Sequence, residues 1–325
     1  MLSCLNTSHH LLILGATGLF GRHLLPKLFT HFDNFLNKPK LTIVTRSKSK
    51  ALALFPSLET YSDLIEMDFL LANNITKGNN YTHIIHMANT SASETFSGAN
   101  QYSKYQLLLN SSIAIRNLIL DGGVRRIVFT SSGIAYGETS NYSESQNSSL
   151  NHLHPSSSLA FGKLTAEYIL SNSTLDLDCE LSIARCFSFI SPFLPVEIHY
   201  AIGNFIKNAV HNEDIIVNSD GRDIRSYQNV EDTVDWLIFL LTTKNSIPIL
   251  NVGDDNAISI ADLAYRVKKV LNSNSTVNIK NNKTLDHNQR RFNYVPNISL
   301  ARSMGLTNHW DLNSSIEQLS LRLSD

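Results

Sequence analysis

Short apolar runs alternate with amphipathic stretches over the first half of the chain. Two stretches that separate the apolar runs, residues 19–32 and 100–123, carry apolar side chains at helical spacing and are predicted helices. Gly122 and Gly123 end the second of them. Pro26 conflicts with the first helix and predicts a kink in it. Strands that alternate with helices predict an α/β fold with a parallel sheet covered on both faces. The apolar runs predicted as buried strands are LLILG (11–15), LTIVT (41–45), HIIHMA (83–88) and RRIVFTSS (125–132).

The second half has a less regular pattern. Residues 139–158 are dense in Ser, Asn and His and predict a loop. Beyond them helical spacing returns at 159–172, and a strand follows at 179–187. The later part of the chain predicts a small α/β lobe without internal repeats or a long linker. Its amphipathic helices lie at 230–241 and 259–271, the latter with Ser259 as its N-cap.

Composition narrows the class of protein. The chain has 325 residues, of which 17% are charged, and a formal net charge of −1. Such a balance indicates neither a nucleic-acid partner nor a membrane surface. Cys4, Cys179 and Cys186 are too few and too scattered for a disulfide framework or a metal-ligand cluster, so we expect no metal and a cytoplasmic location. The apolar run at 11–14 is too short to span a bilayer.

A glycine-rich turn follows the first predicted strand. In LLILGATGLFG, Gly15 allows a tight turn, Gly18 lets a pyrophosphate approach the backbone, and Gly21 lets helix and strand pack closely. The context predicts a dinucleotide site, with a purely structural turn as the alternative. We therefore predict a Rossmann-type, doubly wound NAD(P)-binding domain over 1–187. A smaller substrate-binding lobe follows over 188–325, with some of its elements returning to the first domain.

The end of the second strand bears on the choice of cofactor. An acidic residue there would bind the adenosine ribose hydroxyls, but this chain has VTRSKSK, with Arg46 and Lys48. A guanidinium and an ammonium suit a 2′-phosphate, so NADP is favoured over NAD. The alternative is that both residues simply begin a solvated helix.

Taken together, these motifs resemble the extended short-chain dehydrogenase/reductase family, in its nucleotide-sugar epimerase/dehydratase branch. The similarity extends over nearly the whole chain. The segments that carry it are GATGLFG, EMDF (66–69), IIHMAN (84–89), VRRIVFTSSGIAYG, GKLTAEY, ARCFSFISP, DGRDIRSYQNVEDTVDWL, ILNVGDDNAISIADLA and RRFNYVPNISLARSMGL (290–306).

The resemblance implies site residues. Ser132 and Lys163 would be catalytic. Substrate contacts would come from Ser132, Ser188, Arg225, whose guanidinium would bind the pyrophosphate of a nucleotide sugar, and Arg290. It also implies a homodimer formed through helices 100–121 and 159–172. The expected cofactor contacts are Gly15, Thr17, Gly18, Leu19, Phe20, Gly21, Arg46, Asp68, Phe69, Met87, Ala88, Asn89, Asn110 and Lys163.

Three positions depart from the family pattern. Leu159 stands four residues before Lys163, where the family has Tyr; Ser188 replaces an Asn and Ser191 a Gly. In this family the Tyr phenol moves the proton, the Lys charge favours its phenolate, and Ser polarises the same oxygen. Leucine has no proton to give. Tyr136 is interpreted as structural, and the match of Tyr265 with Lys269 to the Tyr–Lys spacing as coincidence.

Three interpretations remain open. In the first, the chain is an NAD(P)-dependent nucleotide-sugar epimerase, dehydratase or 4-ketoreductase with an altered proton relay, acting in surface-polysaccharide synthesis. In the second, it is an NAD(P)(H)-binding sensor or partner protein with weak or no catalytic activity. In the third, it is a sequence that is losing its function. The first is favoured because Ser132, Lys163 and Arg225 remain. Glu138, His152 and His154, in or near the loop, are weaker candidates for the missing proton donor.

Overall fold

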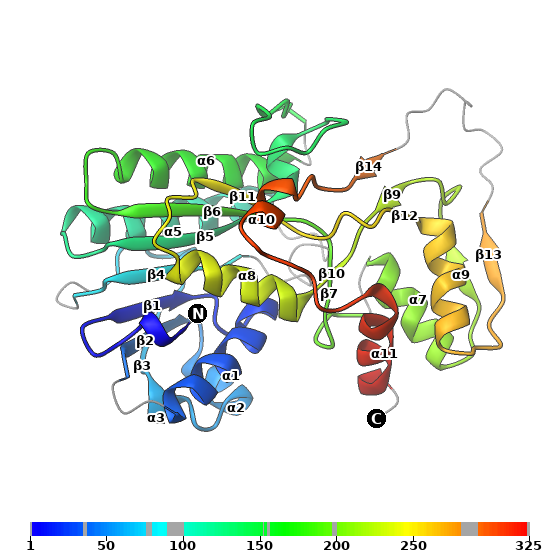
Figure 1. Ribbon diagram of the computed structural model, residues 1–325, viewed down its shortest axis with the longest axis horizontal. Coiled ribbons are helices and arrows are strands. Elements are labelled where there is room, and N and C mark those ends of the chain that lie inside the picture. The colour runs from blue at the N-terminus through cyan, green and yellow to red at the C-terminus, as the bar shows by residue number, and fades with distance from the viewer. Residues whose placement is uncertain are drawn as a thin grey trace. The chain divides into compact units, whose positions relative to one another are not determined.

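The computed structural model (Figure 1) describes residues 2–34, 38–75, 80–89, 101–151, 153–154, 157–196, 200–280 and 292–323. The chain forms two compact units. The first comprises residues 1–138, 147–185 and 234–250, and the second comprises 139–146, 186–233 and 251–325. Each unit is therefore built from separate stretches of the sequence.

A seven-stranded sheet forms the centre of the first unit, in the order β11-β6-β5-β4-β1-β2-β3. β1 pairs in parallel with β2 and β4, β2 with β3, and β4 with β5. The parallel α/β fold predicted from the alternating pattern is thus confirmed. The strands are β1 (His10–Leu14), β2 (Lys40–Thr45), β3 (Asp63–Glu66), β4 (His83–His86), β5 (Arg126–Ser132), β6 (Glu180–Cys186) and β11 (Ile249–Val252).

Helices lie on both sides of this sheet (Figure 1). α5 packs along α6, and the Lys27 ammonium of α1 lies 2.5 Å from the Asp235 carboxylate of α8. The helical elements are η1 (Leu2–Cys4), α1 (Leu19–Asp33), α2 (Lys48–Leu54), α3 (Leu58–Tyr61), α5 (Gln101–Leu120), η2 (Gly133–Tyr136), α6 (Ser158–Ser173) and α8 (Val230–Thr242).

Buried apolar side chains fill the space between sheet and helices. All five residues of β1 are buried, which explains why its sequence is continuously apolar rather than alternating. Leu12, Ile84, Ile115 and Phe129 belong to one core cluster that joins β1, β4, α5 and β5. The predicted strands and helices of this unit end within a few residues of the observed ones.

Local details differ from the sequence predictions. α1 continues through Pro26 as a single helix, with Leu24, Leu25 and Leu28 buried on either side of the proline; the kink expected there stays a prediction. β3 and α3 were not predicted, and α2, which begins at Lys48, was anticipated only as the alternative in which Arg46 and Lys48 begin a solvated helix. β3 has only half-buried and exposed residues, so it lacks the apolar run that identified the other strands.

The second unit consists of short strands and helices. Three small sheets have the orders β10-β7, β12-β9-β14 and β13-β8, and α7, α9 and α11 pack together. Ser259 caps α9 as predicted, since its side chain accepts the Asp262 N–H. The elements are β7 (Phe189–Ile190), α7 (Ala201–Val210), β8 (Ile215–Val217), β9 (Ile224–Arg225), β10 (Gln228–Asn229), β12 (Ile258–Ser259), α9 (Ile260–Val270), β13 (Val277–Ile279), β14 (Asn293–Tyr294), α10 (Ser299–Ser303) and α11 (Leu312–Leu323).

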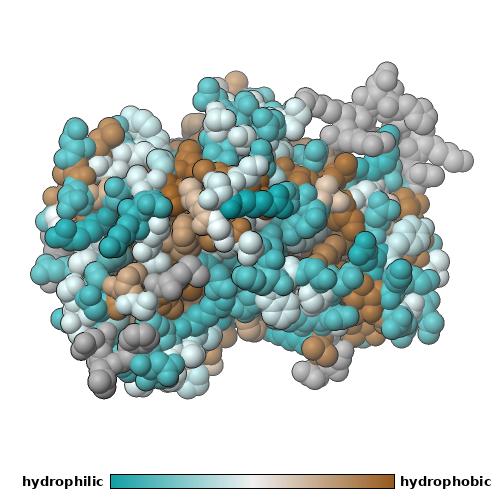
Figure 2. Space-filling view, viewed as in Figure 1, coloured by the Kyte–Doolittle hydropathy of each residue, from teal (hydrophilic) through white to brown (hydrophobic). Residues whose placement is uncertain are grey.

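The surface seen in Figure 2 is largely hydrophilic, with apolar side chains in small groups between polar ones. Among the described residues, no helix combines the length and apolar character needed to cross a bilayer.

Gly21 provides a test of helix–strand packing in the first unit. A Cβ there would overlap the backbone carbonyl of Ala16, which cannot move away as a side chain can. We expect Gly21→Ala to lower the free energy of unfolding by about 3 kcal/mol or more, measured by urea denaturation. Gly18→Ala is the control, because its Cβ would come only within 3.2 Å of Gly15 O. Equal stability of the two variants would contradict this account.

Candidate functional site

The glycine turn leaves the start of α1 open. Gly15 has φ +86°, and a Cβ on it would lie 2.5 Å from the Ala88 nitrogen, so only glycine fits between β1 and the segment after β4. Gly18 begins α1 without a side-chain cap. No side chain of the N-cap residue therefore occupies the first N–H groups of this 15-residue helix, which suits a pyrophosphate.

The segment after β4 lies beside this turn, and the segment after β3 contacts α5. The Met87 N–H donates to Leu14 O at 2.8 Å, which holds the end of β4 beside that of β1. Asn110 of α5 donates through Nδ2 to Phe69 O at 2.7 Å, and the Asp68 carboxylate accepts the Leu70 N–H at 2.9 Å. The structure thus ties several predicted cofactor residues together, although they come from distant parts of the sequence.

Both positive and negative side chains lie at the end of β2, although the sequence just after β2 supplies only the positive ones. Arg46 and Lys48 are exposed there, as expected for cations that could meet a phosphate. However, Glu66 at the end of β3 places its carboxylate 2.7 Å from the Lys48 N–H.

Lys163 lies inside the first unit rather than on its surface. It is 3% exposed, donates from Nζ to Thr130 O at 2.6 Å, and lies 4.9 Å from the centre of the Phe129 ring. Ser132 ends β5, and its Oγ accepts the Ile134 N–H at 3.4 Å. Leu159 lies one turn before Lys163 on α6 and packs against the core cluster.

A buried histidine lies behind Lys163. His86 is fully buried, and its Nε2 is 2.9 Å from Ser111 Oγ. Burial lowers the pKa of His86 to about 3, and the positive charge of Lys163 adds to the effect. His86 is therefore a neutral hydrogen-bonding group at ordinary pH, and it adds no positive charge to that of Lys163.

A buried ion pair connects α6 to two strands. The Glu167 carboxylate accepts Arg185 Nε at 3.1 Å and Nη2 at 2.7 Å, and it also accepts the hydroxyl of Ser131. The Arg185 guanidinium lies 4.2 Å from the centre of the Tyr136 ring. Burial alone would lower the pKa of Arg185, but hydrogen bonds and the charge of Glu167 raise it above its usual value. Tyr136 is completely buried, in keeping with its interpretation as structural.

Arg225 is the predicted phosphate-binding residue of the second unit. Its guanidinium lies 4.6 Å from the centre of the Phe292 ring and 5.8 Å from that of Tyr294, and it donates to Ile224 O at 3.0 Å. Ser188 is half-buried and accepts the Gln228 N–H through its carbonyl at 3.1 Å. Arg290 and His152 lie outside the described residues.

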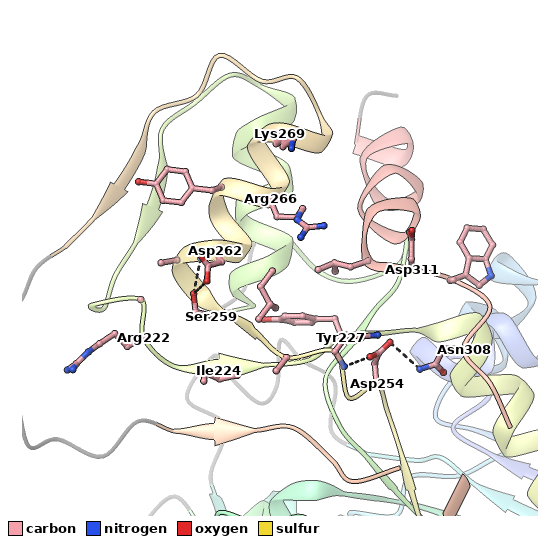
Figure 3. Close-up of a pocket in the computed structure, with 18 of the residues that line it drawn as sticks. Arg222, Ile224, Tyr227, Asp254, Ser259, Asp262, Arg266, Lys269, Asn308 and Asp311 are labelled. Atoms are coloured by element: carbon pink, nitrogen blue, oxygen red, sulfur yellow. Dashed lines mark hydrogen bonds between the residues drawn. The ribbon is translucent and has the colours of Figure 1, made fainter. Parts of the chain in front are cut away.

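A groove of about 1180 Å³ lies elsewhere in the second unit, lined by residues of β9, β12, α9 and α11 (Figure 3). Tyr227, Asp254, Arg266 and Asn308 contribute to its lining. Burial raises the pKa of Tyr227 to about 12, so its phenol stays protonated. The groove does not include Arg225.

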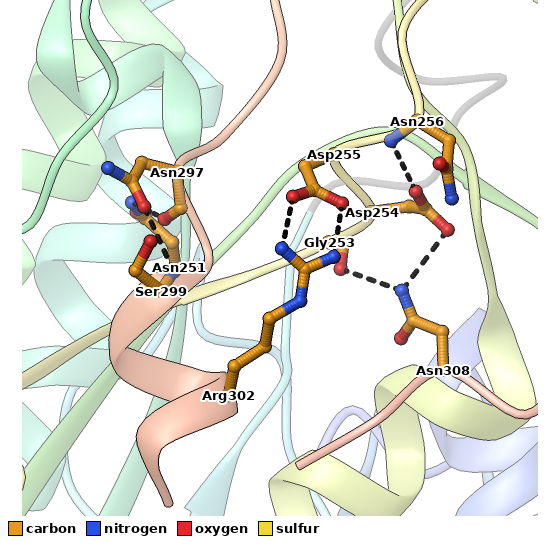
Figure 4. Close-up of polar contacts among 9 residues, drawn as sticks. All are labelled: Asn251, Gly253, Asp254, Asp255, Asn256, Asn297, Ser299, Arg302 and Asn308. Carbon is orange, nitrogen blue, oxygen red and sulfur yellow. Dashed lines mark hydrogen bonds and ion pairs between the residues drawn. The ribbon is translucent and has the colours of Figure 1, made fainter. Parts of the chain in front are cut away.

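Polar contacts hold the strand and loop over residues 251–256 in place (Figure 4). Asn251 donates through Nδ2 to Tyr142 O at 2.8 Å and to Asn297 O at 3.0 Å. Arg302 forms a two-pronged ion pair with Asp255, with distances of 2.6 and 2.8 Å. These hydrogen bonds and this ion pair fix the segment against the loop and helix over residues 297–302.

Comparison with known proteins places this geometry in a family. Residues 11–253 match the profile of the NAD dependent epimerase/dehydratase family. The chain belongs to this family. The predicted family, and with it the predicted class of enzyme, is therefore confirmed. UDP-glucuronic acid decarboxylase 3 of Arabidopsis thaliana is 26% identical over 303 residues, covering 90% of this chain and 82% of that protein.

Solved structures have the same fold. UDP-glucose 4-epimerase of Thermotoga maritima, bound to UDP-glucose, superimposes with a TM-score of 0.76 at 16% identity, covering 97% of this chain and 98% of that chain. UDP-glucose 4-epimerase of Thermus thermophilus, bound to NAD, gives 0.75 at 14% identity, with 97% and 98% covered. At such identities these epimerase/dehydratase structures show the fold alone.

Several residues around the candidate site were missed from the sequence. Glu167 follows Lys163 by four positions on the same helix, and Arg185 interrupts an apolar strand. A buried arginine in a strand needs an anionic partner, and that requirement could have pointed to Glu167. Glu66 gave no such signal, because it becomes relevant only when β2 and β3 are aligned.

The buried Glu167–Arg185 pair generates a stability prediction. Glu167→Gln leaves the Arg185 charge uncompensated in a buried position, so we expect the free energy of unfolding to fall by about 3–5 kcal/mol. Urea denaturation would measure it. The control is Asp255→Asn, which breaks the partly exposed pair with Arg302 and should cost about 1 kcal/mol or less. Similar losses in both variants would contradict the assigned importance of the buried pair.

Proposed function

We propose that this protein catalyses an NAD(P)-dependent conversion of a nucleotide sugar, with a proton relay that differs from the usual family arrangement. The proposal rests on one observation: the chain keeps three features of the family pattern, which are the glycine turn, Ser132 at the end of β5, and buried Lys163 on α6. Arg225 of the second unit is a fourth such feature. UDP-sugars are the first substrates to consider, since the relatives are named for UDP-glucuronic acid and UDP-glucose.

Each retained side chain has a role in this reaction. The cofactor, when bound, supplies a nicotinamide that accepts or gives a hydride. The open N-terminus of α1 binds its pyrophosphate. The Lys163 ammonium has three donors, one of which goes to Thr130 O, and its charge favours negative charge developing nearby. The Ser132 hydroxyl polarises the reacting oxygen of the sugar.

Leu159 changes the proton step. A leucine cannot accept or give a proton, so the hydroxyl of the sugar must exchange its proton with another group. We propose Glu138 and His154, which lie in or near the loop before α6, as candidates for this proton-exchanging group. Losing a positioned acid or base costs about 10²–10⁴-fold in rate, which leaves measurable activity.

The second unit supplies the proposed substrate side. The Arg225 guanidinium, held over the rings of Phe292 and Tyr294, suits a diphosphate, which it can bind with two parallel hydrogen bonds. Ser188 and Arg290 are proposed as further substrate contacts. A role in surface-polysaccharide synthesis and a cytoplasmic location remain predictions.

Leu159 itself favours a second candidate function. A cofactor-binding protein with little turnover, acting as a sensor or partner subunit, would need the glycine turn and Lys163 but no proton donor. It would not need Arg225 to bind a nucleotide sugar, so binding of the sugar nucleotide separates the two functions.

The experiment compares the wild-type protein with Leu159→Tyr. Both would be incubated with UDP-glucuronic acid or UDP-glucose and NAD or NADP, following nicotinamide absorbance and the sugar products. We expect slow turnover by the wild-type protein and an increase of about 10²-fold or more in Leu159→Tyr. No turnover in either protein, with no UDP-sugar binding by calorimetry, would overturn the enzymatic proposal.

We also propose a homodimer formed through α5 and α6. Tyr102 of α5 and Phe161 and Tyr168 of α6 are exposed, with Tyr168 70% accessible, and the Tyr105 and Phe161 rings stack with their centres 5.9 Å apart. Aromatic side chains of this kind are enriched at interfaces.

The dimer is tested by Tyr168→Glu. We expect the wild-type protein to have twice the chain mass of 36.3 kDa by light scattering, and the variant to have the mass of one chain, because a buried charge opposes association. Leu321→Glu, an exposed position on α11, is the control and should remain dimeric. A wild-type monomer would refute the proposal.

The NADP preference predicted from Arg46 and Lys48 stays a prediction. The two cations support it, and the Glu66 carboxylate next to them opposes it.

A further inference from the structure

The acidic group absent from the end of β2 is present on the neighbouring strand. β2 and β3 run in parallel, with Thr45 opposite Glu66, so both strands end at the same edge of the sheet. The Met67 N–H donates to Thr45 O at 2.8 Å and continues the pairing for one more residue. The side chain of Glu66 is therefore fixed next to the turn between β2 and α2, where a dinucleotide fold receives the adenosine ribose.

The Glu66 carboxylate extends over the first turn of α2. Its Oε2 lies 2.7 Å from the Lys48 nitrogen. Ser47 already caps this short helix, since its Oγ accepts the Lys50 N–H at 3.3 Å. Glu66 thus accepts the Lys48 N–H and adds a negative charge at the position of a 2′-phosphate. A phosphate bound there would need this N–H group as a donor and positive charge nearby.

We propose that Glu66 determines the cofactor specificity of this protein. It takes the part that an acidic residue at the end of β2 plays in NAD-specific folds: its free oxygen accepts a hydrogen bond from the adenosine ribose 2′-hydroxyl and its charge repels a 2′-phosphate. The inference rests on the proposed NAD(P)-dependent function. It reverses the preference expected from Arg46 and Lys48 alone, and NAD(H) is the favoured cofactor.

Conformational order explains why one carboxylate outweighs two cations here. Arg46, Lys48 and Glu66 are all exposed, so solvent screens the three charges alike, but ordering the longer side chains of the two cations costs more conformational entropy. Glu66 is held by the Lys48 N–H and has fewer rotatable bonds. A phosphate dianion would have to displace this carboxylate from its donor before using it.

A purely structural role for Glu66 makes a different prediction. If the carboxylate only satisfies the Lys48 N–H, then Glu66→Gln keeps an acceptor oxygen of the same shape and changes neither stability nor cofactor preference. The neutral amide removes the negative charge and little else. Cofactor preference is therefore the measurement that separates a specificity role from a capping role.

The test is a set of binding constants for NADH and NADPH, measured by calorimetry at low ionic strength on the wild-type chain, Glu66→Gln and Glu317→Gln. Glu317 is an exposed residue of α11 in the second unit and controls for the change in net charge. We expect the wild-type protein and Glu317→Gln to bind NADH more tightly than NADPH. In Glu66→Gln the affinity ratio should move at least ten-fold toward NADPH, with an unchanged melting temperature.

An additional variant locates the gain. Adding Arg46→Ala to Glu66→Gln should remove most of the new NADPH affinity, because the guanidinium is then the main cation available to the phosphate. An affinity ratio in Glu66→Gln within two-fold of the wild-type value would overturn the inference while leaving the proposed function intact. So would a wild-type preference for NADPH. Failure of the folded wild-type protein to bind either dinucleotide would overturn both.

Discussion

The carboxylate of Glu167 joins three elements on which the first unit's site depends. It accepts two hydrogen bonds from Arg185 on β6 and one from Ser131 on β5, while its own helix, α6, carries Lys163. Ser131 directly precedes Ser132, so one buried anion fixes both the strand that ends in Ser132 and the helix that presents Lys163. Such a pair contributes little net stability compared with an apolar packing, but it constrains geometry strongly because neither charge can be left alone.

The cofactor side of the site follows from a second constraint, the close approach of backbones. Only glycine fits at position 15, because the backbone of Ala88 lies against it, and only glycine fits at position 21, because the Ala16 carbonyl lies against it. β1 and β4 pair in parallel, so their ends lie at one edge of the sheet, and Gly15 lets the backbone after β4 approach the end of β1. The parallel pairing of β2 and β3 adds Glu66 to the same edge. Backbone spacing therefore decides which side chains can surround a dinucleotide.

Much of this arrangement could be predicted from the sequence. Continuous apolar strands, helical spacing and the glycine turn identified the α/β fold, because each depends on local chemistry. The contacts of Glu167 and Glu66 could not be predicted in that way, since they join residues on different strands and helices. Glu66 is the clearer case: cations at Arg46 and Lys48 suggested one cofactor from the local sequence, and the register of a weakly apolar neighbouring strand introduced the opposing charge.

The proposed loss of the proton donor at Leu159 leaves the rest of the candidate site in place. Leu159 lies one turn before Lys163 and packs against the core cluster, so leucine at this position adds apolar contact where the resemblance predicts a phenol. The free energy of folding therefore gives no reason to prefer tyrosine over leucine at position 159. Lys163 keeps its bond to Thr130 O, and Glu167 keeps Arg185, without any contribution from position 159. The contacts that hold Lys163 and Glu167 are thus independent of position 159, so the proposed change of proton donor at this position would leave the framework the same.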